Sequence, residues 1–268
     1  MLPLNTSRGY AGPQVAFIHV GKSGGTSVEA WLKQHRVPFR YYHVHNRPPK
    51  TSAGSSAVPH VVWVRDPLER FRSAYEYERA VVLTNTTALG MTRNKTTWCT
   101  LGPDCMAPAK IANKVLTGHA YEPHFEQLLL HFSSANQLGE SLSSPVPADA
   151  AFARELMTSP VEHIQKGLGY YLHDGAFLRP PPSRLFVGSM EYMDEDLRRL
   201  GRWLGLATID GSGFNERRNP QQATPPPFSP LARTNLCRAY NKTDFAVLRE
   251  LVRLHLLDAS RYDLTCAQ

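Results

Sequence analysis

The sequence predicts an α/β fold: a P-loop-like parallel sheet flanked by helices, forming a single domain over residues 1–268. Three observations predict it. An apolar segment at 15–20 is followed by a glycine-rich loop and then by helical spacing. A second strand–helix unit begins at 60–64. The chain is 42% hydrophobic, which is enough for a full core, and it contains no internal repeat or clear second-domain boundary.

The first unit carries the loop GKSGGTS (21–27) between its strand and its helix. The backbone N–H groups of such a loop can surround a phosphate at a helix N-terminus, where the helix dipole favours negative charge. Lys22 adds a mobile cation, and Thr26 and Ser27 add hydroxyl donors. Ala16 stands where a Walker A loop requires glycine, so a nucleoside triphosphatase is disfavoured. An ordinary glycine-rich turn remains the alternative.

The second unit begins with HVVWV (60–64), which follows another expected strand at 39–46. Arg65 comes directly after it, at the predicted carboxyl edge of the sheet. Pro67 suits the first turn of a helix, and Ser73 lies on that helix. Ligands of open parallel sheets bind at the carboxyl edge. The two units together therefore predict a ligand with two separate anionic groups.

These two units resemble known motifs. FIHVGKSGGTS is similar to the 5′-phosphosulfate loop, and VRDPLERFRSAY to the 3′-phosphate motif, of sulfotransferases that use 3′-phosphoadenosine 5′-phosphosulfate (PAPS). The resemblance is to the Golgi carbohydrate type, including the uronyl and heparan sulfate 2-O-sulfotransferases. A third segment, 184–206, resembles the late strand and amphipathic helix of that family. The sequence departs from the family at Gly21, where the family has proline, so the turn is expected to be more flexible.

The resemblance implies transfer of a sulfuryl group from PAPS to an acceptor hydroxyl, expected on a carbohydrate, by in-line displacement with a general base. PAPS is expected as co-substrate, and no metal is expected. Lys22 is expected to be catalytic, because its charge would balance that of the leaving phosphate. Arg65 and Ser73 are expected to bind the 3′-phosphate. The full set of residues expected to bind PAPS is Lys22, Ser23, Gly24, Gly25, Thr26, Ser27, Arg65 and Ser73.

The general base is expected among the histidines, with His45 as first choice and His43 as second. Strand alternation places both on one side of the segment 39–46. They also resemble the Tyr-His-x-His element of the uronyl 2-O-sulfotransferases, in which the second histidine is the base. A structural role for these histidines remains open. Glu29 and His60 are weaker candidates.

Cysteines and sequons bear on the compartment. The expected disulfides are Cys99–Cys105, inside an expected insertion at 84–110, and Cys237–Cys266. Four free cytosolic thiols are the alternative. The sequence also contains four N-glycosylation sequons, at Asn5, Asn85, Asn94 and Asn241. We therefore expect a glycoprotein of the Golgi lumen or secretory pathway that reaches a membrane only through an anchor absent from this chain.

The remaining segments are expected to be peripheral: an N-terminal extension at 1–14, a proline-rich loop at 211–230, and a closing helix capped by Asp244. Thirty Lys and Arg against 23 Asp and Glu give a net charge of +7, which suits an anionic ligand. These basic residues are dispersed, so no nucleic-acid partner is expected. The alternative functions are a catalytically inactive or polyanion-binding module, and a P-loop kinase-like phosphotransferase.

Overall fold

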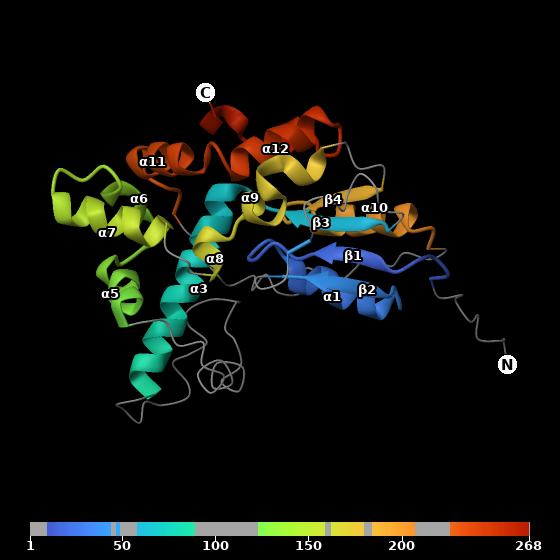
Figure 1. The fold of residues 1–268 in the computed structure, drawn as a ribbon, viewed down its shortest axis with the longest axis horizontal. Coiled ribbons are helices and arrows are strands. Elements are labelled where there is room, and N and C mark those ends of the chain that lie inside the picture. Colours follow the sequence, from blue (N-terminus) through green and yellow to red (C-terminus); the bar gives the residue numbers. More distant parts are fainter. Residues whose placement is uncertain are drawn as a thin grey trace. The chain divides into compact units, whose positions relative to one another are not determined.

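The structure is a computed structural model. It describes residues 10–43, 47–48, 58–88, 123–158, 162–179, 184–206 and 226–267. Within these residues the chain forms an α/β fold in which a parallel sheet of four strands, in the order β2-β1-β3-β4, is flanked by helices (Figure 1). The predicted fold class is confirmed.

The sheet uses the strands that the sequence predicts. They are β1 (Val15–Ile18), β2 (Phe39–Tyr42), β3 (His60–Val64) and β4 (Leu185–Ser189). β3 has the predicted bounds, because its five residues are all buried. β1 is shorter than the predicted segment 15–20, because the chain turns after it and the N–H of Ser23 donates to the carbonyl of Val20 at 3.2 Å.

Helices cover both faces of this sheet. On one face lie α1 (Gly25–Gln34) and α10 (Met193–Trp203), which pack with Phe17 and Trp63 of the sheet in one buried cluster. The other face is represented by His60, whose ring meets the ring of Phe177 edge-on at 5.3 Å. Phe177 belongs to the 3-10 helix η2 (His173–Leu178), which packs with α9 (Leu168–Tyr171) and α12 (Asp244–Arg253).

The chain divides into two compact units, each made of several segments. The first is Met1–Arg70, Lys166–Asn215 and Tyr240–Gln268, and the second is Phe71–Gln165 and Glu216–Ala239. The sheet belongs to the first unit, which also contains the 3-10 turns η3 (Ala259–Arg261) and η4 (Leu264–Ala267). The expectation of a single domain stays a prediction.

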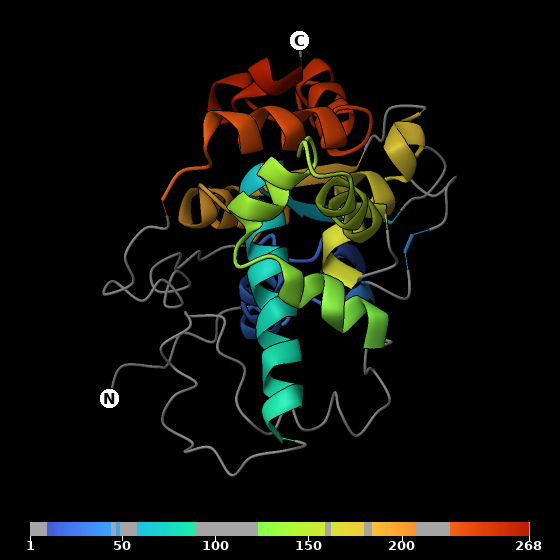
Figure 2. The same cartoon turned by 90° about the vertical axis from the view of Figure 1, so that its left-hand side faces the viewer.

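The second unit is helical in its described part. Its helices are most of α3 (Pro67–Ala88), α5 (Pro123–His131), α6 (Ala135–Ser141), α7 (Pro147–Thr158), α8 (Glu162–Gln165) and α11 (Pro230–Tyr240, except its last residue). Figure 2 shows α3 as one long helix. The Tyr75 hydroxyl ties α3 to α5, because it donates to the carbonyls of Leu129 and Phe132 at 2.9 and 2.6 Å.

The expectation that Asp244 caps the closing helix needs correction. Asp244 does not cap α12: its carboxylate accepts from the N–H of Gly169 at 2.9 Å and pairs with Arg70 at 3.2 Å, so it is engaged outside its own helix. The helices α8 and α9 are separated at Lys166 and Gly167. The chain is extended at Gly167, where any side chain would meet the Asp244 carboxylate.

The predicted disulfides, terminal extension, insertion and proline-rich loop lie only partly within the described residues. Cys237 and Cys266 form the predicted disulfide. Cys99 and Cys105 lie outside the described residues, as do residues 1–9 and 211–225 and the insertion from residue 89 on. Among the described helices, none is both long and apolar enough to cross a bilayer.

Candidate functional site

A turn of unusual backbone conformation joins β1 to α1, and we call residues 19–25 the glycine loop. Lys22 and Gly24 have left-handed φ values of 67° and 80°. An alternation of left-handed with other conformations directs successive N–H groups to one side. Among the described residues, the amides of Gly24, Gly25 and Thr26 have no hydrogen-bond partner. The loop thus presents unpaired donors at the N-terminus of a ten-residue helix.

Ser23 adds a buried donor to this loop. The residue is 0% exposed, and its Oγ has no hydrogen-bond partner among the described residues. Leaving a buried hydroxyl unpaired costs about 1–3 kcal/mol, and a bound oxyanion could remove that cost. Gly24 has a φ of 80°, so this position favours glycine for its backbone conformation.

The structure brings together the basic residues predicted from the two strand–helix units. The Nη1 of Arg65, directly after β3, donates to the carbonyl oxygen of Lys22 at 3.2 Å. Both side chains are half-buried. The loop after β1 and the residue after β3 therefore meet at one edge of the sheet, as two adjacent parallel strands require.

Helix α3, which follows Arg65, carries two polar residues with different roles: Arg70, which is structural, and Ser73, which the sequence predicts to bind the 3′-phosphate. Arg70 is 1% exposed, pairs with Asp244 and has its guanidinium 5.7 Å from the Tyr240 ring centre. It is therefore part of the core. Ser73 is half-buried on α3 and belongs to the second unit. Its role toward a 3′-phosphate stays a prediction.

Two histidines stack beside the glycine loop. The rings of His19 and His43 lie 4.3 Å apart and within 11° of parallel. His43 Nδ1 lies 3.1 Å from the carbonyl oxygen of His19. Because a carbonyl only accepts, Nδ1 of His43 carries the proton, and in the neutral ring Nε2 carries the lone pair. In its neutral form, His43, the second choice for the base, therefore carries its lone pair on Nε2.

Two tyrosines complete this cluster. The Tyr41 hydroxyl forms a hydrogen bond with His19 Nδ1, and the Tyr171 hydroxyl lies 3.4 Å from His43 Nδ1. Tyr171 also interacts with the backbone N–H of Gly21. Burial raises the pKa of both phenols, so both keep their protons at neutral pH.

The other candidate bases either lie apart from this cluster or lie outside the described residues. His45 lies outside the described residues. His60 opens β3 at the opposite end of the strand from Arg65, and burial lowers its pKa. Glu29 forms an ion pair with Lys33 at 2.5 Å on the surface of α1.

Sequence reasoning missed three members of the cluster: His19, Tyr41 and Tyr171. A local signal exists for the first two, because strand alternation places His19 on the same face as Phe17, and Tyr41 on the same face as His43. Tyr171 has no such signal, because α9 reaches the loop only through the tertiary fold.

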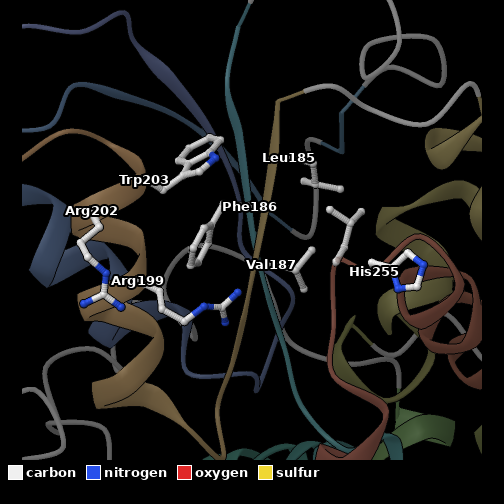
Figure 3. Close-up of a pocket in the computed structure, with 8 residues that line it drawn as sticks. Leu185, Phe186, Val187, Arg199, Arg202, Trp203 and His255 are labelled. Carbon is white, nitrogen blue, oxygen red and sulfur yellow. The ribbon is translucent and has the colours of Figure 1, made fainter.

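A cavity away from the glycine loop is lined by other residues. It has a volume of about 390 Å³ and runs along β4. Figure 3 shows Arg199, Arg202 and Trp203 of α10 on one side of β4, and His255 on the other. Since none of the predicted site residues lines it, the unpaired donors of the glycine loop, and not this cavity, define the candidate site.

Comparisons of the chain with family models, with curated proteins and with solved structures find no match. Within the described residues, no group of three or more His, Cys, Asp or Glu is arranged to hold a metal ion. The case for a function therefore rests on the geometry of the glycine loop and its neighbours.

Proposed function

We propose that this protein is a sulfotransferase that moves a sulfuryl group from PAPS to a hydroxyl of a carbohydrate acceptor. The observation that carries the proposal is the glycine loop, with its unpaired amides, the unpaired buried hydroxyl of Ser23, and Lys22 and Arg65 joined at its rim. An anion with several oxygens would satisfy these donors together.

The loop fits the chemistry of sulfuryl transfer. In-line displacement breaks the bond between sulfur and the bridging phosphate oxygen while the acceptor oxygen bonds to sulfur. Negative charge then grows on the leaving phosphate. The ammonium of Lys22 and the amides of Gly24, Gly25 and Thr26 would stabilise that charge in a site that is already organised. The side chains of Thr26 and Ser27 would provide further donors.

His43 is our choice for the residue that takes the acceptor's proton. Its Nδ1–H is held by the His19 carbonyl, and in the neutral ring Nε2 carries the lone pair that would take the acceptor's proton. His45 remains the other candidate, from its position in the same segment of sequence. Alanine variants of the two histidines distinguish these candidates. Loss of the true base should slow transfer by about 10²- to 10⁴-fold with little change in PAPS affinity.

Arg65 would hold the 3′-phosphate, the group that distinguishes PAPS from ATP, and the assignment of Ser73 to the same group rests on the sequence resemblance alone. The planar guanidinium of arginine matches the geometry of a phosphate. The Cys237–Cys266 disulfide supports an oxidising compartment, which agrees with a Golgi or secretory location.

The test is transfer of label from ³⁵S-labelled PAPS to a panel of uronic acid-containing glycans, neutral glycans and small hydroxyl compounds. We expect labelled glycan, and a rate of labelling about 10²- to 10³-fold lower with a Lys22→Ala variant. Thermal unfolding with 3′-phosphoadenosine 5′-phosphate and with ATP gives a second measurement. Equal stabilisation by both nucleotides would argue against a 3′-phosphate site. Polyanion binding without turnover would favour the inactive or polyanion-binding module, and phosphate transfer from ATP would favour the kinase-like alternative.

A further inference from the structure

We infer that the outer edge of β4 is a docking site for an extended acidic segment of a partner protein, which pairs with this strand through its backbone. β4 is the last strand in the order β2-β1-β3-β4, so one of its sides has no neighbouring strand among the described residues. The cavity of about 390 Å³ lies along this strand, and we call it the β4 groove. Its lining residues all belong to the first unit. The inference is independent of the proposed function, because the β4 groove contains no residue of the glycine loop.

The backbone groups of β4 alternate between its two sides. The N–H of Met190, directly after the strand, donates to the carbonyl of Val64 in β3 at 2.8 Å. In a parallel ladder every second residue before it faces β3 in the same way. The N–H and C=O groups of Leu185 and Val187 therefore point to the outer side, where no described residue bonds to them. Such a row of backbone donors and acceptors is a template for another strand.

Asp196 limits the length of this open edge. Its carboxylate accepts from the N–H of Ser189, the next outward group, at 2.8 Å. Pairing with another strand is thus restricted to Leu185 and Val187, and an antiparallel partner would exchange two hydrogen bonds with each of them. A segment of about three to five residues is long enough to make these bonds.

Side chains on both sides of β4 form the walls of the groove. Figure 3 shows Arg199, Arg202 and Trp203 of α10 on one side, and His255, which follows α12, on the other. Trp203 is 40% exposed, and its ring centre lies 5.7 Å from that of Phe186. An exposed tryptophan beside an open strand edge gives a docked segment a large apolar contact.

The charges of the groove favour an acidic occupant. Arg202 is exposed and makes no ion pair with a described residue, and Arg199 pairs with Asp196 of its own helix. A second cavity, of about 320 Å³, shares Trp203 and includes Arg184. The described residues that line the two cavities include no Asp or Glu. Such a lining attracts a negatively charged segment and disfavours a second copy of this chain, whose net charge is +7.

The strand edge favours a polypeptide over other anions. Leu185 and Val187 present N–H and C=O groups at the spacing of an extended backbone, which a peptide strand complements. A phosphate ion or an acidic glycan would contact the arginines but has no such backbone to pair with the strand. Backbone pairing gives affinity in this mode of recognition, and the arginines select an acidic sequence.

The first test measures binding of a fluorescent peptide of about eight residues, in which glutamate alternates with valine, by fluorescence anisotropy. We expect saturable binding that Arg202→Glu weakens by about 3- to 10-fold. The control is Arg198→Glu, because Arg198 is exposed on the same helix but lies outside the groove, and it should change binding by less than about twofold. Absence of binding, or an equal effect of the two variants, would overturn the inference.

Two further peptides separate charge from backbone pairing. One has lysine in place of glutamate, and the other keeps glutamate but has methylated backbone amides. Each should bind at least about tenfold more weakly than the first peptide. A methylated peptide that bound as tightly as the first would show that backbone pairing is not used, and a lysine peptide that did so would show that charge is not read.

Hydrogen exchange identifies the surface that the peptide occupies. At saturation, the amides of Leu185 and Val187 should exchange at least about tenfold more slowly, whereas those of Gly24 and Gly25 should not change. Unprotected β4 amides, displacement of the peptide by 3′-phosphoadenosine 5′-phosphate, or equally tight binding of an acidic glycan would refute the docking site. Protection of β4 that rises with protein concentration in the absence of peptide would assign the edge to a second copy, and would also refute it. A failure to turn over PAPS would leave these results unchanged.

Discussion

Replacing Gly25 by alanine tests the packing on which the candidate site depends. Gly25 does not need a left-handed φ, so the substitution adds no backbone strain and its cost comes from space alone. The new methyl group would overlap the His19 ring, with Cγ at 2.5 Å. Since the Phe17 and His43 rings stack on His19, its imidazole can move away only by losing those contacts.

The magnitude can be worked out from the contacts. Exchanging glycine for alanine in a helix gains up to about 1 kcal/mol. Against this, overpacking costs about 1–3 kcal/mol. Losing the Tyr41–His19 hydrogen bond costs about 1 kcal/mol, and losing the stack on His43 about 0.5–1.5 kcal/mol. We expect a net loss of about 1.5–4.5 kcal/mol in the free energy of unfolding, and a fall in Tm of about 2–4 °C per kcal/mol.

The assay is a double-mutant cycle, in which Gly25→Ala is measured by denaturant unfolding in wild-type protein and in His19→Ala. Removing the imidazole creates room for the methyl group, so in that background Gly25→Ala should be neutral or slightly stabilising. The coupling energy should therefore be at least about 1.5 kcal/mol. The reasoning fails if Gly25→Ala costs the same in both backgrounds, or costs nothing in wild type.

Three further predictions follow from other contacts. Lys22→Ala should lower kcat by about 10²- to 10³-fold, whereas Arg65→Ala should mainly weaken PAPS binding, by about 10- to 100-fold, in steady-state kinetics and calorimetry. Arg70→Met leaves a buried carboxylate unpaired and should cost about 3–5 kcal/mol in chemical unfolding. Cys237→Ser should cost about 2–4 kcal/mol by losing the bridge to Cys266, and reduction of wild type should have the same effect.

Each of these predictions has an opposing outcome. Identical kinetic changes in the Lys22 and Arg65 variants would mean that the two residues do not serve separate anionic groups. An Arg70→Met protein as stable as wild type would mean that its carboxylate partner is solvated. Insensitivity of wild-type unfolding to reductant, with Cys237→Ser equally stable, would remove the disulfide from the account of stability.

The sequence was sufficient for the sheet because the strand signals were local. The run 60–64 is apolar throughout, and the structure has a strand with those bounds. The strand–loop–helix order also located Lys22 and Arg65 correctly at the carboxyl edge, since parallel strands fix that geometry. Helix α11 was not predicted, although Pro230 at its first position, preceded by Ser229, whose Oγ accepts from a backbone N–H of the first turn, is a recognisable start.

The rest of the site depends on contacts that are distant in sequence. The sequence predicted that Asp244 caps its own helix, but its carboxylate accepts a hydrogen bond from Arg70, 174 residues away. The spacing of His43 relative to His19 and Tyr171 arises from a sheet pairing and a helix contact, at separations of 24 and 128 residues. The tautomer of His43 follows from such a contact, so the sequence alone favoured His45 as base and did not place His19 beside His43.

The left-handed backbone of Lys22 has an evolutionary consequence. For a residue with a Cβ, this conformation destabilises the folded state by about 1–2 kcal/mol, and glycine lacks this penalty. Selection for thermostability alone should therefore drive position 22 toward glycine or asparagine, whereas selection that also requires anion chemistry should keep lysine. Deep mutational scanning under the two regimes would reveal this conflict as opposite rankings of the same substitutions. A lysine that ranked first under both would show that the fold itself prefers it.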